Sequence, residues 1–91
     1  MAEHHEETVE VAAHSNAGRY PEHGFDKVPA SQKVIVELEL AAKALGITNL
    51  SNWIAKVGTK EIDTSLSYEQ NGLKGSVLID LGPRESGGGD A

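Results

Sequence analysis

Residues 31–45 carry the pattern of a single amphipathic helix, and segments with the period of a β-strand lie on both sides of them. Four apolar residues share one stripe at the 3.6-residue period of an α-helix: Val34, Leu38, Ala41 and Leu45. The pairs Lys33–Glu37 and Glu39–Lys43 have the i,i+4 spacing of ion pairs on a helix surface, and we expect both on the solvent side. The apolar stripe has to be buried against another element.

The ends of this segment favour a helix over a strand. Pro29 and Ser31 are typical of a helix start, and Gly46 suits the position just past the last turn. The run Val34–Leu40 contains β-branched residues and could alternate as a strand, which is the competing interpretation. We predict a helix over Ser31–Leu45.

Before the helix, the sequence predicts a β-hairpin. Residues 8–14 alternate in character, with the apolar side chains of a strand that buries one face: Val9, Val11 and Ala13. Residues 16–18 (Asn-Ala-Gly) have turn chemistry, and residues 19–28 return as a second strand. Because Pro21 cannot donate a hydrogen bond to a neighbouring strand, we expect this second strand at an edge of the sheet.

After the helix, the sequence predicts three further strands. Residues 53–57 (WIAKV) form the first, residues 58–60 a turn, and residues 61–62 a brief second strand. The last strand has three apolar residues on one face: Val77, Ile79 and Leu81. Leu66 and Leu73 are isolated in the polar stretch before it, and we expect them to anchor a loop to the core.

This order predicts an α+β fold, with a mixed sheet of four to five strands and one helix packed across it. A hairpin followed by one helix and further strands is the element order of the β-grasp. The 91 residues suffice for one compact core. We expect residues 1–7 to be a disordered extension, residues 8–82 the folded domain, and residues 83–91 a flexible glycine-rich tail.

Composition narrows the possible partners and the possible location. The sequence has no cysteine, which excludes disulfide scaffolds, thiolate zinc sites and cysteine nucleophiles. Fourteen acidic and eight dispersed basic residues give a net charge of −6, the wrong sign for binding nucleic acid or an anionic membrane. No apolar run is long enough to span a bilayer. We therefore expect a cytoplasmic monomer that binds neither nucleic acid nor membrane.

No residue pattern indicates catalysis or metal binding. The four histidines lack the spacing of a preformed metal site, and we expect them to be solvated: His4, His5, His14 and His23. Ser15, Ser65 and Ser67 have no neighbouring base that would make one of them a nucleophile. We expect neither enzymatic activity nor a cofactor.

The segment from Trp53 to Gly89 contains a strand, a Gly-Lys turn, a short apolar-acidic strand, a Ser-Leu-Ser-Tyr loop and an Asn-Gly-Leu turn. A strand that opens with Ser follows and runs into a glycine-rich tail. In this succession of motifs the segment resembles ubiquitin and its relatives. The hairpin and the helix match the family in order and length rather than in residues. The resemblance implies a ubiquitin-like β-grasp over about residues 8–89, in a small and distant relative, with the prokaryotic ubiquitin-like proteins as one candidate group.

In that family, partners recognise an exposed apolar patch on the third and last strands. If the apolar residues of the last strand face inward, four residues take the outward positions here: Ile54, Lys56, Leu78 and Asp80. Two of the four are charged. We therefore expect that proteins which recognise ubiquitin do not recognise this surface.

The tail contains the run Gly87-Gly88-Gly89. In the family, an activating enzyme adenylates the carboxylate of a terminal glycine, which then becomes either a thioester for transfer to a lysine or a thiocarboxylate that donates sulfur. A glycine has no Cβ, so it can pass extended through a narrow channel. Asp90-Ala91 follow the glycines here and would have to be removed by a processing protease.

The resemblance leaves three functions open. The leading prediction is a non-enzymatic protein modifier, conjugated through a processed glycine and served by an activating enzyme and a protease. A sulfur carrier would use the same carboxylate for thiocarboxylate chemistry. A protein-interaction module would have an inert tail.

Overall fold

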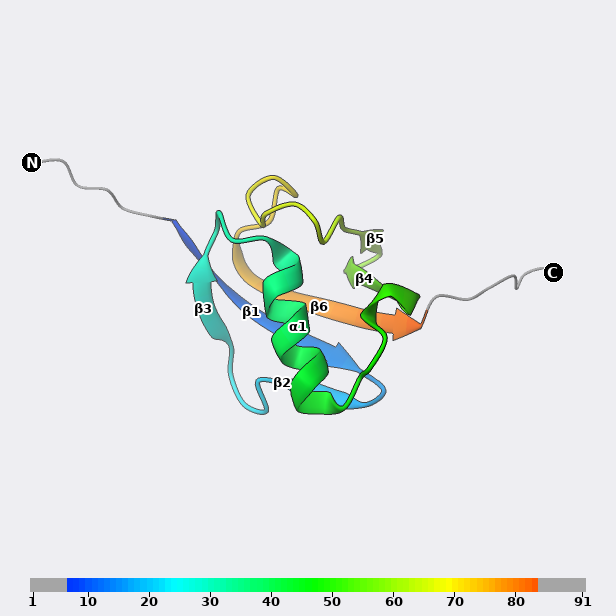
Figure 1. The fold of residues 1–91 in the computed structure, drawn as a ribbon. Coiled ribbons are helices and arrows are strands. Elements are labelled where there is room, and N and C mark those ends of the chain that lie inside the picture. The colour runs from blue at the N-terminus through cyan, green and yellow to red at the C-terminus, as the bar shows by residue number, and fades with distance from the viewer. Residues whose placement is uncertain (1–6, 84–91) are drawn as a thin grey trace, which may run out of the picture.

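The computed structural model describes residues 7–83 (Figure 1). Along the chain, its elements are β1 (Thr8–Ser15), β2 (Gly18–Tyr20), β3 (Asp26–Pro29), α1 (Val34–Leu45), the 3₁₀ turn η1 (Leu50–Asn52), β4 (Trp53–Val57), β5 (Lys60–Glu61) and β6 (Gly75–Pro83).

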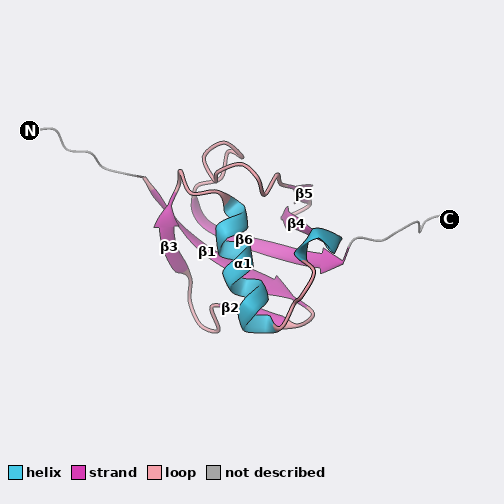
Figure 2. Ribbon diagram, viewed as in Figure 1, coloured by secondary structure: helices cyan, strands magenta, loops and turns pink. Residues whose placement is uncertain are grey.

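The two longest strands, β1 and β6, pair in parallel at the centre of a sheet with the order β2-β1-β6-β4-β5. The other pairs are antiparallel, and β3 pairs with the first half of β1 while β2 pairs with the second half. The helix α1 crosses one face of this sheet (Figure 2). The predicted α+β architecture is confirmed, although the sheet has six strands among the described residues rather than four to five.

The helix begins at Val34 and not at the predicted Ser31. Lys33 has extended backbone angles and pairs with Ser67 in an isolated bridge. The N–H group of Val34 donates to the carbonyl of Leu66 at 3.0 Å. The start of α1 is therefore set by a contact with a distant loop, which the local sequence pattern does not contain.

The inner face of α1 is wider than the predicted stripe. Its fully buried residues include Val34, Leu38 and Ala41, as predicted, whereas Leu45 is half-buried. Glu37 is also buried, at 1% exposed, so the prediction that the Lys33–Glu37 pair lies on the solvent side is wrong for Glu37. Position 37 lies three residues after Val34 and four before Ala41, inside the apolar face of a helix packed broadly on a sheet.

The predicted return strand over residues 19–28 is two short strands, β2 and β3. Pro21 offers no N–H to the sheet, and the Nη1 atom of Arg19 donates to the Pro21 carbonyl at 3.0 Å. These two features hold the segment between the strands out of the ladder. β2 lies at the end of the strand order, so the predicted edge position is confirmed.

The strands after the helix follow the prediction closely. β4 has the predicted bounds, and the predicted inward residues of β6 are all buried: Val77, Ile79 and Leu81. β5 comprises Lys60–Glu61 rather than residues 61–62. Ile62 lies just beyond it, where its N–H donates to the Ala55 carbonyl and its side chain is buried in the core.

The loop between β5 and β6 is anchored by a tyrosine. Tyr68 is fully buried in the core, whereas Leu66 is 37% exposed, so the prediction that Leu66 anchors the loop is wrong. Leu73 is partly buried against the core, as predicted. The loop is held by hydrogen bonds that Ser67 and Gln70 exchange, backbone N–H to side-chain oxygen in both directions. These bonds turn the chain so that Tyr68 points inward and Leu66 does not.

Candidate functional site

The structure places all four predicted surface residues on the outward face of β4 and β6. Leu78 and Asp80 alternate with the buried residues of β6 and are exposed, Lys56 is exposed, and Ile54 is half-buried. Lys56 lies directly opposite Asp80 in the antiparallel register. The predicted surface is therefore continuous, with a carboxylate on the central strand and a lysine beside it.

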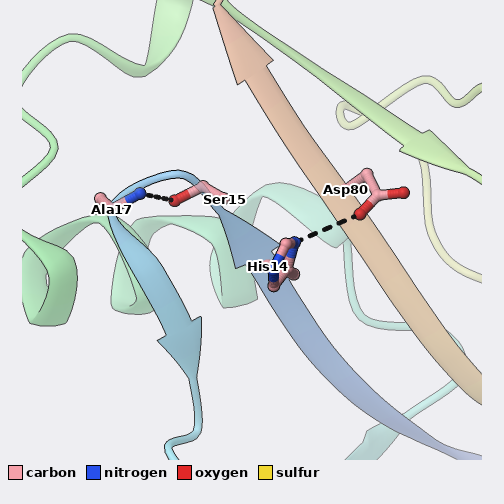
Figure 3. Close-up of polar contacts among 4 residues, drawn as sticks. All are labelled: His14, Ser15, Ala17 and Asp80. Atoms are coloured by element: carbon pink, nitrogen blue, oxygen red, sulfur yellow. Dashed lines mark hydrogen bonds and ion pairs between the residues drawn. The ribbon is translucent and has the colours of Figure 1, made fainter.

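His14 joins this surface from the neighbouring strand. The parallel register of β1 and β6 places His14 opposite Asp80, and the two side chains point toward each other (Figure 3). The His14 Nδ1 and Asp80 Oδ1 atoms are 3.6 Å apart, and the side chains are 59% and 56% exposed. At this exposure an ion pair contributes little to stability, so the contact matters mainly for the charge pattern that the surface presents.

Sequence reasoning assigned His14 no role beyond solvation. Its contact with Asp80 depends on which strand lies beside β1 and in which register, and neither is encoded near His14 in the chain. No local signal could have found it.

A groove of about 580 Å³ lies at the ends of β1, β4 and β6. It is lined by His14, Ser15, Asn16, Ile54, Lys56, Asp80, Leu81, Gly82 and Pro83. One edge is the turn after β1, where the Ser15 hydroxyl accepts a hydrogen bond from the N–H of Ala17 at 2.9 Å (Figure 3). The groove thus has charged groups of both signs beside a partly apolar wall.

Leu78 does not line the groove. It lies two residues before Asp80 on the same face of β6, opposite Ala12 of β1, and is 46% exposed. Ala12 is on the outward face of β1 by alternation, but it is fully buried. Of this pair, Leu78 is therefore the side chain that presents apolar surface to the solvent. The predicted four residues therefore divide into three in the groove and one beside it.

The predicted tail residues Gly87, Gly88 and Gly89 lie outside the described residues, as do residues 1–6 of the predicted extension (residues 1–7) and residues 84–91 of the predicted tail (residues 83–91). The last described residue, Pro83, ends β6 at the wall of the groove.

Within residues 7–83, no cluster of three or more His, Cys, Asp or Glu side chains lies where it could hold a metal ion. No helix in this part of the chain is long and apolar enough to cross a membrane.

Comparison with known proteins supports the fold. Neither a scan against protein-family models nor a search of curated proteins finds a significant match to the sequence. Among solved structures, the chain is similar to the ubiquitin-like domain from tubulin-binding cofactor B, with a TM-score of 0.68 and 16% sequence identity. The similarity covers 96% of this chain and 99% of that one. The fold is therefore a ubiquitin-like β-grasp.

Proposed function

We propose that this protein is a ubiquitin-like modifier, which partner enzymes attach to other proteins through a glycine of the run Gly87–Gly89. One observation carries the proposal: the chain forms a ubiquitin-like β-grasp whose last strand ends at Pro83, and three consecutive glycines begin four residues later in the sequence. A glycine triplet alone is a weak motif. Its position just after the last strand of this fold is what makes it specific.

The proposed chemistry uses the glycine carboxylate and no catalytic group of this chain. An activating enzyme of the partner system transfers AMP from ATP to the carboxylate and releases pyrophosphate. A cysteine thiol of that system then displaces AMP and forms a thioester with the glycine. The side chain of any other residue would obstruct a channel shaped for glycine. Asp90 follows the glycines, so a protease has to cleave after Gly88 or Gly89 before activation.

The folded body would be recognised through the surface of β1, β4 and β6. The groove beside Pro83 presents His14, Lys56 and Asp80 with a wall that includes Ile54. Charged pairs at such a surface favour a complementary partner and disfavour one built for a purely apolar patch. We expect partners dedicated to this protein rather than those that bind ubiquitin itself.

The first alternative is a sulfur carrier, in which the same activated glycine carboxylate receives sulfur and becomes a thiocarboxylate. The second is a protein-interaction module with an inert tail. The similarity to the ubiquitin-like domain from tubulin-binding cofactor B supports the second alternative, because there the same fold is a domain of a larger protein. Intact mass of the protein from its native cell distinguishes the three functions: the chain ends at a glycine, at a glycine plus sulfur, or beyond the glycines.

The reactivity of the tail is tested by ATP–pyrophosphate exchange with an activating enzyme from the same genome. Chains ending at Gly88 or Gly89 should support exchange, whereas the full 91-residue chain should not until it is cleaved. Gly88→Ala in the chain ending at Gly88, and Gly89→Ala in the chain ending at Gly89, should depress exchange strongly.

The control for each alanine variant is the parent chain of the same length. The variant and its parent should have the same circular dichroism spectrum and the same melting temperature, so that a loss of exchange cannot come from unfolding. Equal exchange from the alanine variants would remove the reason for the glycines, and the interaction module would then be the better assignment.

A further inference from the structure

A carboxylic acid lies inside the interface between α1 and the sheet. Glu37 is 1% exposed, and its Oε2 atom is buried without a hydrogen-bond partner among the described residues. Transfer of an ionised carboxylate into such a site costs several kcal/mol, so the group has to be paired with a cation or be neutral.

Three groups from three other elements face Glu37. The Asp26 carboxyl of β3 lies within hydrogen-bonding reach of the Glu37 carboxyl. Tyr20 of β2 and Tyr68 of the loop before β6 interact electrostatically with both acids. The hydroxyl of Tyr68 is itself buried and unpartnered. None of these described groups is a cation, and Lys33 at the start of α1 is exposed. The surroundings of Glu37 therefore suit a neutral carboxyl.

The same surroundings determine the pKa of the Glu37 carboxyl. Burial, followed by the hydrogen bond and the charge of Asp26, raises the pKa of Glu37 from its ordinary value of 4.5 to about 7. Burial and the two acids raise the pKa of Tyr20 and of Tyr68 as well, so both phenols stay protonated at physiological pH. Of Glu37 and the two tyrosines, Glu37 is the group that changes charge near neutrality.

We propose that Glu37 forms a proton-dependent contact between α1 and β3. When protonated, its carboxyl donates a hydrogen bond to the Asp26 carboxylate and joins the helix to the edge of the sheet. When ionised, the two carboxylates repel each other across the same interface, and α1 packs less tightly on β2 and β3. The fold thus contains a pH-sensitive element that is independent of the glycine tail.

The sign of the effect follows from proton binding. Because the pKa of Glu37 is higher in the folded protein than in the unfolded chain, the folded protein retains a proton that the unfolded chain has lost. The stabilisation is complete below about pH 4.5 and disappears as the pH rises through about 7. Between about pH 5 and pH 8 the folding equilibrium constant should fall on the order of a hundredfold.

The titration of Glu37 is measured directly in the unaltered protein. The ¹³C chemical shift of the Glu37 side-chain carboxyl should titrate with a midpoint near pH 7. An ordinary midpoint for Glu37, near pH 4.5, would overturn the proposal. This measurement does not depend on whether any variant folds.

Glu37→Gln tests the consequence for stability. Glutamine keeps the shape of the side chain and an N–H donor for Asp26 but cannot ionise, so the free energy of unfolding should lose its decline between pH 5 and pH 8. The matched control is Glu39→Gln on the same helix, which should decline like the unaltered protein. Both variants retain every histidine, so histidine titration contributes equally to them. An unchanged decline in Glu37→Gln would refute the assignment.

Amide hydrogen exchange tests the location. After correction for the intrinsic pH dependence of exchange, protection in α1 and β3 should fall more than protection in β4 when the pH is raised from about 6 to 8. An equal fall in all three elements would mean that the acid acts on global stability and not at the contact between α1 and β3.

Discussion

Leu38 lies in the contact between α1 and the sheet. It is 1% exposed and belongs to the same buried cluster as Val11 of β1 and Ile79 of β6. Leu40, on the same helix, is 46% exposed. The two leucines have the same helix propensity and differ in burial, so together they separate the two contributions.

Leu38→Ala should lower the free energy of unfolding by about 2–4 kcal/mol, because it removes buried methyl groups and leaves a cavity. Leu40→Ala should change it by less than about 1 kcal/mol. Urea denaturation of both variants measures the difference. Similar losses would show that the packing of the inner face of α1 is not what stabilises the helix.

At the same scale, the charged residues of the groove contribute differently. His14, Lys56 and Asp80 are all exposed, so their mutual attraction is weakened by water. Their effect is on which partner fits the surface and not on whether the chain folds. Glu37 is the opposite case, since it is buried and remote from solvent.

At the scale of elements, the end of α1 is determined by one glycine. Gly46 has a φ of 77°, and its N–H donates to the Ala42 carbonyl, which closes the last turn. A Cβ at this position would meet no atom within 4 Å, so any penalty for a side chain there comes from the backbone angle alone. Gly82 in β6 also has open space but no positive φ.

Gly46→Ala should therefore lower the free energy of unfolding by about 1 kcal/mol, the penalty of a left-handed backbone for a residue with a Cβ. Gly82→Ala should cause no loss, because alanine is at least as favourable as glycine in a strand. Thermal or urea denaturation of the pair measures this. A loss in Gly82→Ala that equals the loss in Gly46→Ala would contradict the backbone explanation.

At the scale of the whole molecule, the core described here is built from residues between Val9 and Leu81. It joins α1 to the inner face of the sheet, with Tyr68 closing the cluster from the loop before β6. The proposed reactive glycines lie beyond this range in the sequence. The fold and the proposed chemistry are therefore separable.

Starting from the chain that ends at Gly89, deletion of residues 1–6 and 84–89 together should leave the melting temperature nearly unchanged while abolishing activation by the partner enzyme. Differential scanning calorimetry and ATP–pyrophosphate exchange on the same preparation measure the two properties. A loss of several degrees would show that one end packs on the folded body, and the tail would then not be a separate handle.

The sequence by itself determined those helices and strands that are specified by residues close together in the chain. Alternation over residues 8–14 and 77–81 predicted the inward-facing side chains of β1 and β6, all of which are buried, although it did not predict that Ala12 on the outward face of β1 is buried too. The 3.6-residue stripe predicted α1 against a competing strand interpretation. Gly46 predicted its end. In each case the deciding residues are within a few positions of one another, so the periodicity of the backbone is enough.

Only the tertiary structure decided the features that depend on pairing between distant segments. The parallel register of β1 and β6 brings His14 to Asp80. The loop before β6 accepts a hydrogen bond from the first residue of α1, so that the helix begins at Val34. The same loop places Tyr68 near Glu37. The sequence pattern assigned Glu37 to a surface ion pair, because spacing along a helix does not reveal how wide a face the sheet will cover. Burial is a property of the assembled layers, and for Glu37 it changes the charge that the residue carries near neutral pH.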